Sequence, residues 1–163
     1  MTDYDDSKKQ RRLSRELALR LLFQHQAAGG GLRPEECLHL FEESFDPKND
    51  LESALEVNPT TFESAWPMAK SLYLGTVEHM SELDRDITIV AHNWRLHRMA
   101  PVDLALMRLA YYEMCYCDEI PPKVSLNEAL EMAKDFGDQD STSFINAILD
   151  QLMSRIGQPE AAT

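Results

Sequence analysis

The sequence VDLALMRLAYYEMCYCDEIPPKVSLNEALEMAKDFGDQDSTSFINAILD, residues 102–150, contains three helical patterns joined by two short turns. Pro101 precedes it and suits the first turn of a helix, where its missing N–H would have no intrahelical partner. Ser125 with Glu128 forms a capping-box pattern that predicts the start of the second helix, and Gly137 is expected to end it. This stretch therefore predicts helices rather than strands.

Helical patterns continue on both sides of this stretch. Asp140 or Ser141 is expected to cap the last helix, and Gly157 with Pro159 to terminate it. Upstream, Gly29–Gly31 is expected to end the first helix, and Pro34 to start a second helix that runs to about Phe45. A third helix is expected to start near Pro59 or Pro67, and a fourth at Ser81 with Asp84. The inward positions of the fourth helix would be Ile87, Val90, Ala91 and Trp94. Residues 46–58 read as a polar loop with some local turn. Because no segment alternates with period two, we predict an all-α, single-domain bundle of about seven helices over 1–163, with flexible ends at about 1–6 and 158–163.

Length and composition agree with one intracellular helical domain. With 163 residues and 44% hydrophobic residues, the chain can bury a core of its own. Its three cysteines lack metal-ligand spacing and are expected to be idle thiols in a reducing compartment. The first 26 residues do not resemble a signal peptide, and no apolar run is long enough to span a bilayer. We therefore expect a cytoplasmic protein that does not associate with membranes.

The charge is distributed unevenly along the chain. The net charge is −12, but residues 8–20 carry six basic residues and one acidic residue, which leaves 10 basic and 27 acidic residues elsewhere. Ser7 with Gln10 is a possible capping box, and Leu13, Leu17 and Leu21 form one apolar stripe of the helix that follows. The basic residues of the opposite face are Lys8, Arg11, Arg12 and Arg15, and Lys9 is a further basic residue of the same helix start. A solvated helix start is one explanation, and a site for a polyanion on an otherwise acidic protein is the other.

The sequence lacks the patterns of a catalytic or metal site. The five histidines are scattered, without HExxH or CxxC spacing, and Gly29–Gly31 is followed by no Lys-Ser or Lys-Thr. No serine has the context of a nucleophile elbow, and Glu128 with Glu131 reads more simply as two solvated carboxylates. We therefore expect no enzyme activity, no metal and no cofactor.

Phe144 has two interpretations that differ in function. It stands in the first turn of the last helix, directly after Asp140-Ser141-Thr142-Ser143. It could be a core aromatic that anchors this helix. It could instead be a stacking platform for a single-stranded base, beside the unpaired backbone N–H groups of a helix start. The inward stripe of this helix is already supplied by Ile145, Ile148, Leu149 and Leu152, which favours stacking.

The order of motifs resembles the NusB family. The motifs are Leu72-Tyr73-Leu74-Gly75, Glu82-Leu83-Asp84, Asn93-Trp94, Leu106-Met107-Arg108-Leu109, Ile120-Pro121, the Asn127–Gly137 stretch and the Ser141–Asp150 stretch. With the Arg-rich first helix, the resemblance covers most of the chain. It departs from the family at Ala147, where glycine is frequent, and at Phe23, where tyrosine is common. The resemblance implies an all-α fold and RNA-contacting residues at Lys8, Lys9, Arg11, Arg12, Arg15, Asp140 and Phe144, with Arg108 as a weaker candidate.

The function implied by this resemblance is that of an accessory transcription factor. Such a factor, with the small-subunit ribosomal protein NusE, recognises boxA-type nascent RNA and supports antitermination by RNA polymerase, notably on rRNA operons. Glu113, Asp118 and Glu119 form a candidate acidic patch for the basic partner. Two alternatives stay open: a purely protein–protein helical adaptor, and an RNA-modifying enzyme, since some rRNA cytosine methyltransferases carry a NusB-like domain. For the latter, the chain shows no Rossmann-like domain or catalytic cysteine motif. Both a monomer and a homodimer are compatible with the sequence.

Overall fold

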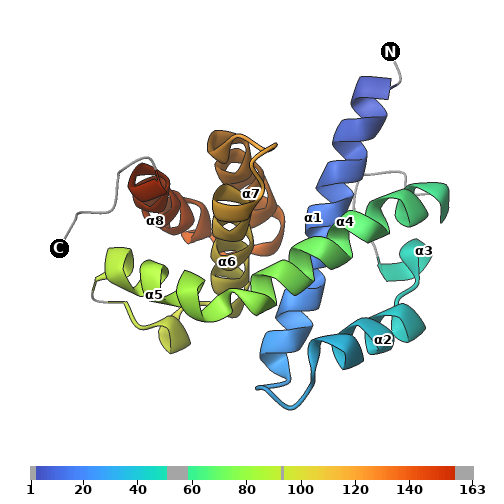
Figure 1. Ribbon diagram of the computed structural model, residues 1–163, viewed down its shortest axis with the longest axis horizontal. Helices are drawn as coiled ribbons and strands as arrows, with labels where there is room; N and C mark the ends of the chain where they lie inside the picture. Colours follow the sequence, from blue (N-terminus) through green and yellow to red (C-terminus); the bar gives the residue numbers. More distant parts are fainter. Residues whose placement is uncertain (1–2, 51–58, 93, 157–163) are drawn as a thin grey trace. The chain divides into compact units, whose positions relative to one another are not determined.

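A computed structural model describes residues 3–50, 59–92 and 94–156, and every regular element within these ranges is a helix. This confirms the all-α prediction (Figure 1). The helices are α1 (Asp3–Ala27), α2 (Pro34–Ser44), α3 (Pro47–Asp50), α4 (Pro59–Glu78), α5 (Met80–Ala91), the 3-10 helix η1 (Leu96–Arg98), α6 (Pro101–Tyr116), α7 (Pro122–Phe136) and α8 (Ser141–Ile156). The short α3 is the local turn expected within residues 46–58, of which 51–58 lie outside the described ranges.

The chain divides into two compact units, residues 1–77 and 78–163. The first contains α1 to α3 and nearly all of α4, and the second contains α5 to α8. The prediction of one domain over 1–163 stays a prediction. Within the described ranges, every helix is too short or too polar to span a bilayer.

In the first unit, α1 lies against α2 and hydrogen-bonds to α4. The predicted apolar stripe of α1 is fully buried at Leu13, Leu17 and Leu21. Ser14 Oγ donates to the Ala65 carbonyl oxygen at 3.0 Å, and Gln10 Nε2 donates to the Ser64 carbonyl oxygen at 2.9 Å. These carbonyls lie just before Pro67, whose ring removes one backbone donor from the interior of α4. Side chains of α1 thus donate to the two carbonyls that follow Glu63, whose own carbonyl loses its intrahelical donor at Pro67.

Four near-parallel aromatic rings join α2 and α4 in the same unit. Phe41 stacks on Phe45 with ring centroids 4.6 Å apart and on Trp66 at 5.5 Å. Phe62 completes the group at 5.7 Å from Phe45 and 5.6 Å from Trp66. The indole Nε1 donates to a carboxylate oxygen of Glu42 at 3.0 Å, so the polar end of the tryptophan is also satisfied.

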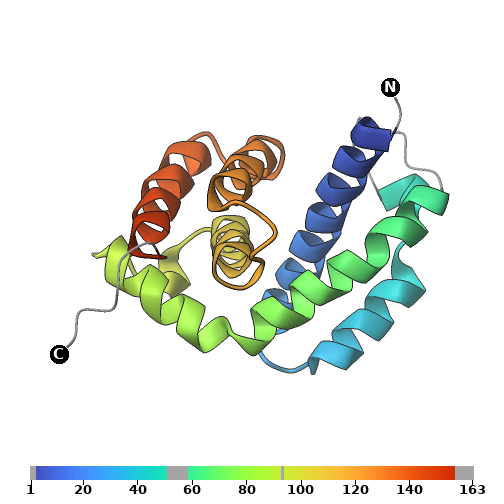
Figure 2. The same cartoon turned by 45° about the horizontal axis from the view of Figure 1, so that its top comes forward.

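In the second unit, α6, α7 and α8 pack against one another, and α5 packs against α6 and α8 (Figure 2). Gly137 ends α7 as predicted, with its N–H donating to the Ala133 carbonyl at 2.9 Å. A Cβ at position 137 would lie 2.6 Å from Ser141 Oγ, so the tight turn into α8 requires glycine. This turn determines where α8 begins, and α8 carries Phe144.

Several predicted helix boundaries were wrong by up to one turn. Helix α7 begins at Pro122, so Ser125 lies inside it, and α5 begins at Met80, so Ser81 is already helical. Helix α1 begins at Asp3, which places Ser7 inside the helix, and the expected flexible end at about residues 1–6 stays a prediction. The expected flexible end at 158–163, with the terminators Gly157 and Pro159, lies outside the described residues.

Candidate nucleic-acid interface

The start of α8 is organised by short-range hydrogen bonds. The Phe144 N–H donates to the Asp140 carbonyl at 3.2 Å, which places Asp140 at the N-cap position by its backbone. Ser143 Oγ donates to the same carbonyl oxygen at 3.2 Å. Ser141 Oγ accepts a hydrogen bond from the Asp138 N–H at 2.8 Å and so ties the preceding turn to the helix. These contacts fix the first turn of α8, which carries Phe144.

Phe144 is half-buried, and among the described residues its ring pairs with the ring of Trp94. The two ring centroids are 5.4 Å apart and the planes meet at 63°, an edge-to-face arrangement. Trp94 follows α5 and is 55% exposed, so the prediction that it points inward was wrong. Phe144 is therefore neither a fully buried core residue nor an isolated surface ring. The sequence signal for the pair was present in the Asn93-Trp94 motif, but helical periodicity assigned the indole to the core.

The two rings line a pocket of about 490 Å³. The other lining residues are Arg98, Met99, Ala100, Asp103, Asp138, Asp140, Ser141 and Ser143. Three carboxylates and one guanidinium thus surround an aromatic corner. Asp103 is only 7% exposed, and its burial raises the pKa of its carboxyl group, while a hydrogen bond from Ser141 acts in the opposite direction. Asp103 was not identified from the sequence, because it occupies an ordinary position in the first turn of α6.

The basic residues of α1 differ in their exposure. Lys8, Lys9 and Arg11 are exposed, and Arg12 is half-buried. Arg15 is only 3% exposed, so the expectation that it faces solvent with the others was wrong. Lys9 Nζ lies 3.3 Å from a carboxylate oxygen of an aspartate one turn earlier, a contact that stays accessible to solvent. The accessible positive charge therefore lies at the first three turns of α1.

Arg108 is held by an ion pair within the second unit. Its Nε and Nη2 each donate to a different carboxylate oxygen of Asp84 at 2.7 Å, a bidentate arrangement between α6 and α5. Its side chain is 10% exposed. In this geometry the Arg108 guanidinium stabilises the contact between α5 and α6. The prediction that Arg108 is a weaker candidate for an RNA contact stays a prediction.

The three acids predicted to form a partner patch are not equally accessible. Glu113 is 1% exposed and accepts a hydrogen bond from Ser125 Oγ at 3.2 Å, so it cannot belong to an exposed patch. The expectation that it faces a partner is corrected accordingly: this contact links α6 to α7. Asp118 and Glu119, which follow α6, are exposed.

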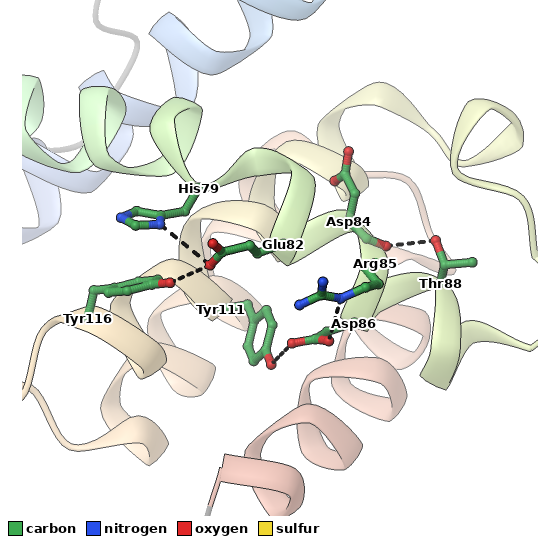
Figure 3. A network of polar contacts seen from close by, with 8 residues as sticks. All are labelled: His79, Glu82, Asp84, Arg85, Asp86, Thr88, Tyr111 and Tyr116. Carbon is green, nitrogen blue, oxygen red and sulfur yellow. Dashed lines mark hydrogen bonds and ion pairs between the residues drawn. The ribbon is translucent and has the colours of Figure 1, made fainter. Parts of the chain in front are cut away.

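A polar and aromatic cluster lies close to the end of α6 (Figure 3). Tyr116 OH donates to Glu82 Oε2 at 2.7 Å, and the His79 ring stacks on Tyr116 with centroids 4.0 Å apart. The hydrogen bond raises the pKa of Tyr116 to about 12 and lowers the pKa of Glu82. Periodicity gave no signal for this cluster, because its members come from the junction of α4 with α5 and from the end of α6.

No group of three or more His, Cys, Asp or Glu side chains is arranged to hold a metal ion in the part of the chain that the structure describes. Among the described residues the three cysteines form no disulfide, and Cys37 is buried while the other two are half-buried.

The fold and the site define an all-helical protein with a basic helix start in one unit and an aromatic-lined, carboxylate-rich pocket in the other. The chain matches the NusB family over residues 12–154 and belongs to that family. It is 38% identical to transcription antitermination protein NusB of Bacillus subtilis over 148 residues, which covers 91% of this chain and 98% of that protein. It is also 38% identical to the Geobacter sulfurreducens protein of the same name, with 90% and 95% covered.

Solved structures agree with this assignment. The structure of T. maritima NusB matches with a TM-score of 0.70 and 29% identity, covering 88% of this chain and 90% of that one. A chain in a crystal structure of antitermination factors NusB and NusE in complex with dsRNA matches with a TM-score of 0.68, covering 90% of this chain and 97% of that one. At 21% identity this second likeness shows the fold alone.

Proposed function

We propose that this chain is a non-catalytic RNA-binding transcription factor of the cytoplasm. With NusE, it recognises boxA-type nascent RNA in a complex with RNA polymerase and supports antitermination, notably of rRNA operons. Membership of the NusB family supports this proposal, as does the likeness in fold to a protein solved with NusE and dsRNA. The remaining support comes from the side chains of the chain itself.

The observation that carries the proposal is the Phe144–Trp94 corner. A half-buried ring beside an indole that is 55% exposed offers apolar faces without being needed to close a core. Single-stranded RNA exposes bases that stack on such rings, and stacking contributes about 1–3 kcal/mol per base. Asp140 at the same helix start adds acceptor oxygens for base edges.

The start of α1 supports the phosphate contacts that the proposal needs. Lys8, Lys9 and Arg11 are exposed within one and a half turns of helix on a protein whose net charge is −12. Such local positive charge on an acidic protein favours a polyanion at this place and a basic partner elsewhere. Asp118 and Glu119 are the exposed acids of the predicted set that stay candidates for NusE.

The deciding experiment replaces the stacking ring. Phe144→Ala should weaken binding of a boxA-like oligonucleotide by about 1–3 kcal/mol. Because the ring is only half-buried, its loss should lower the free energy of unfolding by less than the roughly 3–5 kcal/mol of a core phenylalanine. Phe45→Ala is the matched control: this half-buried phenylalanine belongs to the aromatic group of the first unit, so its loss should affect stability and leave RNA affinity unchanged.

RNA titration and urea denaturation of both variants separate the outcomes. Normal RNA affinity in folded Phe144→Ala would contradict the stacking role. If the parent binds NusE but no single-stranded RNA at low salt, the chain is a protein–protein adaptor and the proposal fails.

The partner surface is tested independently of RNA. Asp118→Lys with Glu119→Lys should weaken capture of the chain by immobilised NusE and leave RNA affinity unchanged or slightly higher. Glu35→Lys with Glu63→Lys reverses two exposed acids of the first unit and provides the control for net charge. Equal loss of NusE binding in both pairs would indicate a general charge effect and contradict a patch after α6.

A further inference from the structure

We propose that the pocket at the start of α8 selects an RNA base that carries an exocyclic amino group, with the buried carboxylate of Asp103 as the acceptor. The inference rests on the proposed function and adds to it a determinant of base preference. It assigns to Asp103 a positioning and discriminating contact, distinct from the stacking contact of Phe144.

One carboxylate oxygen of Asp103 accepts no hydrogen bond from the described residues. The residue lines the pocket, is 7% exposed, and its Oδ1 atom has no hydrogen-bond partner among the residues that the structure describes. A buried polar atom left unpaired costs about 1–3 kcal/mol, and more for a charged group. A ligand that brings an N–H group into the pocket would remove this cost.

The carboxyl group is held in place by its neighbours. The Asp138 N–H donates to Ser141 Oγ at 2.8 Å, and the Ser141 hydroxyl in turn hydrogen-bonds to the Asp103 carboxyl group. The same turn is fixed by Gly137, where a Cβ would meet Ser141. The acceptor and the first turn of α8 therefore form one preorganised arrangement that a ligand need not assemble.

The pocket lining disfavours a phosphate and suits a planar base that donates hydrogen bonds. A phosphate inside it would face the carboxylates of Asp103, Asp138 and Asp140, which repel it. The same three carboxylates outnumber Arg98 and would attract a cationic side chain of a protein partner, so the second test below distinguishes that occupant from a base. Arg98 can attract the phosphate attached to an inserted base. Trp94 and Phe144 supply aromatic surface, and about 490 Å³ is room enough for a neutral planar base.

The acceptor discriminates between bases by their edges. The 4-amino group of cytosine donates two hydrogens, and the amino groups of adenine and guanine offer the same chemistry. Uracil presents the O4 acceptor at the place where cytosine has its amino group, so it would meet the Asp103 carboxylate with repulsion. Cytosine and uracil have similar rings and stack similarly, which makes them a matched pair.

The first test uses the unmodified full chain. Binding of 12-residue oligocytidylate and oligouridylate is measured at low salt by fluorescence anisotropy, with a third oligonucleotide whose cytosines lack the 4-amino group. A hydrogen bond to a charged group predicts about a tenfold preference for oligocytidylate over both others. Equal affinity for all three would overturn the inference while leaving the proposed function standing. If no oligonucleotide binds, both fail.

The second test changes the acceptor. In Asp103→Asn, whose side chain also carries a donor, the preference for oligocytidylate should fall to about onefold while oligouridylate binds as well as before or better. Asp150→Asn, an exposed aspartate of α8 outside the pocket, should retain the tenfold preference. An unchanged preference in Asp103→Asn, combined with weaker NusE binding, would show that the pocket takes a cationic side chain and would overturn the inference. Because the first test needs no substitution, misfolding of a variant cannot rescue it.

Discussion

Removing the Arg108 guanidinium should lower the free energy of unfolding and leave the RNA affinity of the folded protein unchanged. Arg108→Met retains the length and much of the apolar stem of the side chain but removes both donors to Asp84, each 2.7 Å from its acceptor. The carboxylate would then stand between α5 and α6 without its charged partner. The prediction separates a structural arginine from an RNA-contacting one.

The magnitude follows from the burial of the pair. Breaking a buried ion pair by removing one partner costs about 3–5 kcal/mol. The Asp84 side chain is 24% exposed and can be partly hydrated, so we expect the lower end of that range, about 3 kcal/mol. With a urea m value of about 2 kcal/mol per molar, the unfolding midpoint should fall by about 1.5 M.

Circular dichroism during urea denaturation measures this shift, and titration with RNA in the absence of urea measures the affinity. Asp84→Asn and the combined variant complete a double-mutant cycle, in which the two losses should be far from additive because each removes the same pair. An unchanged midpoint in Arg108→Met would refute the structural role. A tenfold loss of RNA affinity at an unchanged midpoint would restore Arg108 as an RNA contact.

The remaining predictions concern the start of α1 and the cluster near the end of α6. Lys8→Glu with Arg11→Glu should weaken RNA binding and reduce the log–log salt slope by about 0.7 for each phosphate that the variant no longer neutralises, with an unchanged melting temperature. Arg15→Glu should instead lower the melting temperature, because it places an acid at a buried position. An ultraviolet pH titration should show Tyr116 ionising near 12, and Glu82→Gln should return its pKa toward 10. Since the folded pKa of this tyrosine is raised, its contribution to stability is complete below pH 10 and is lost as the pH rises toward 12, which thermal melts at pH 9 and pH 12 can compare.

Proline and glycine residues at helix ends made most of the fold predictable from the sequence. Pro34 and Pro101 start helices and Gly137 ends one, because each restricts or frees the backbone whatever surrounds it. Capping signals were less reliable. Ser125 resembles a helix cap in the sequence. In the structure it lies inside α7 and its hydroxyl donates a hydrogen bond to Glu113, a tertiary contact that no local sequence pattern predicts.

The candidate site was less predictable than the fold. Phe144 and Asp140 could be proposed from their place at a helix start and from the family resemblance. Arg15 and Glu113 show why charge alone was insufficient: a charged residue on a polar helix face is normally solvated, yet both are nearly fully buried. Asp103 could not be identified from the sequence. Its proposed role depends on a hydrogen bond from Ser141, which is distant in the sequence and follows the tight turn at Gly137.

The placement of the two tryptophans makes the protein its own fluorescent reporter. Trp66 belongs to the stacked aromatic group of the first unit, and Trp94 stands at the Phe144 corner of the second. A Trp66→Phe variant would emit only from the exposed indole, whose intensity should respond to an arriving base. A Trp94→Phe variant would emit only from the half-buried one, whose spectrum should shift to the red when the stacked rings separate. Occupancy of one unit and melting of the other can thus be followed in the same cuvette without any attached dye.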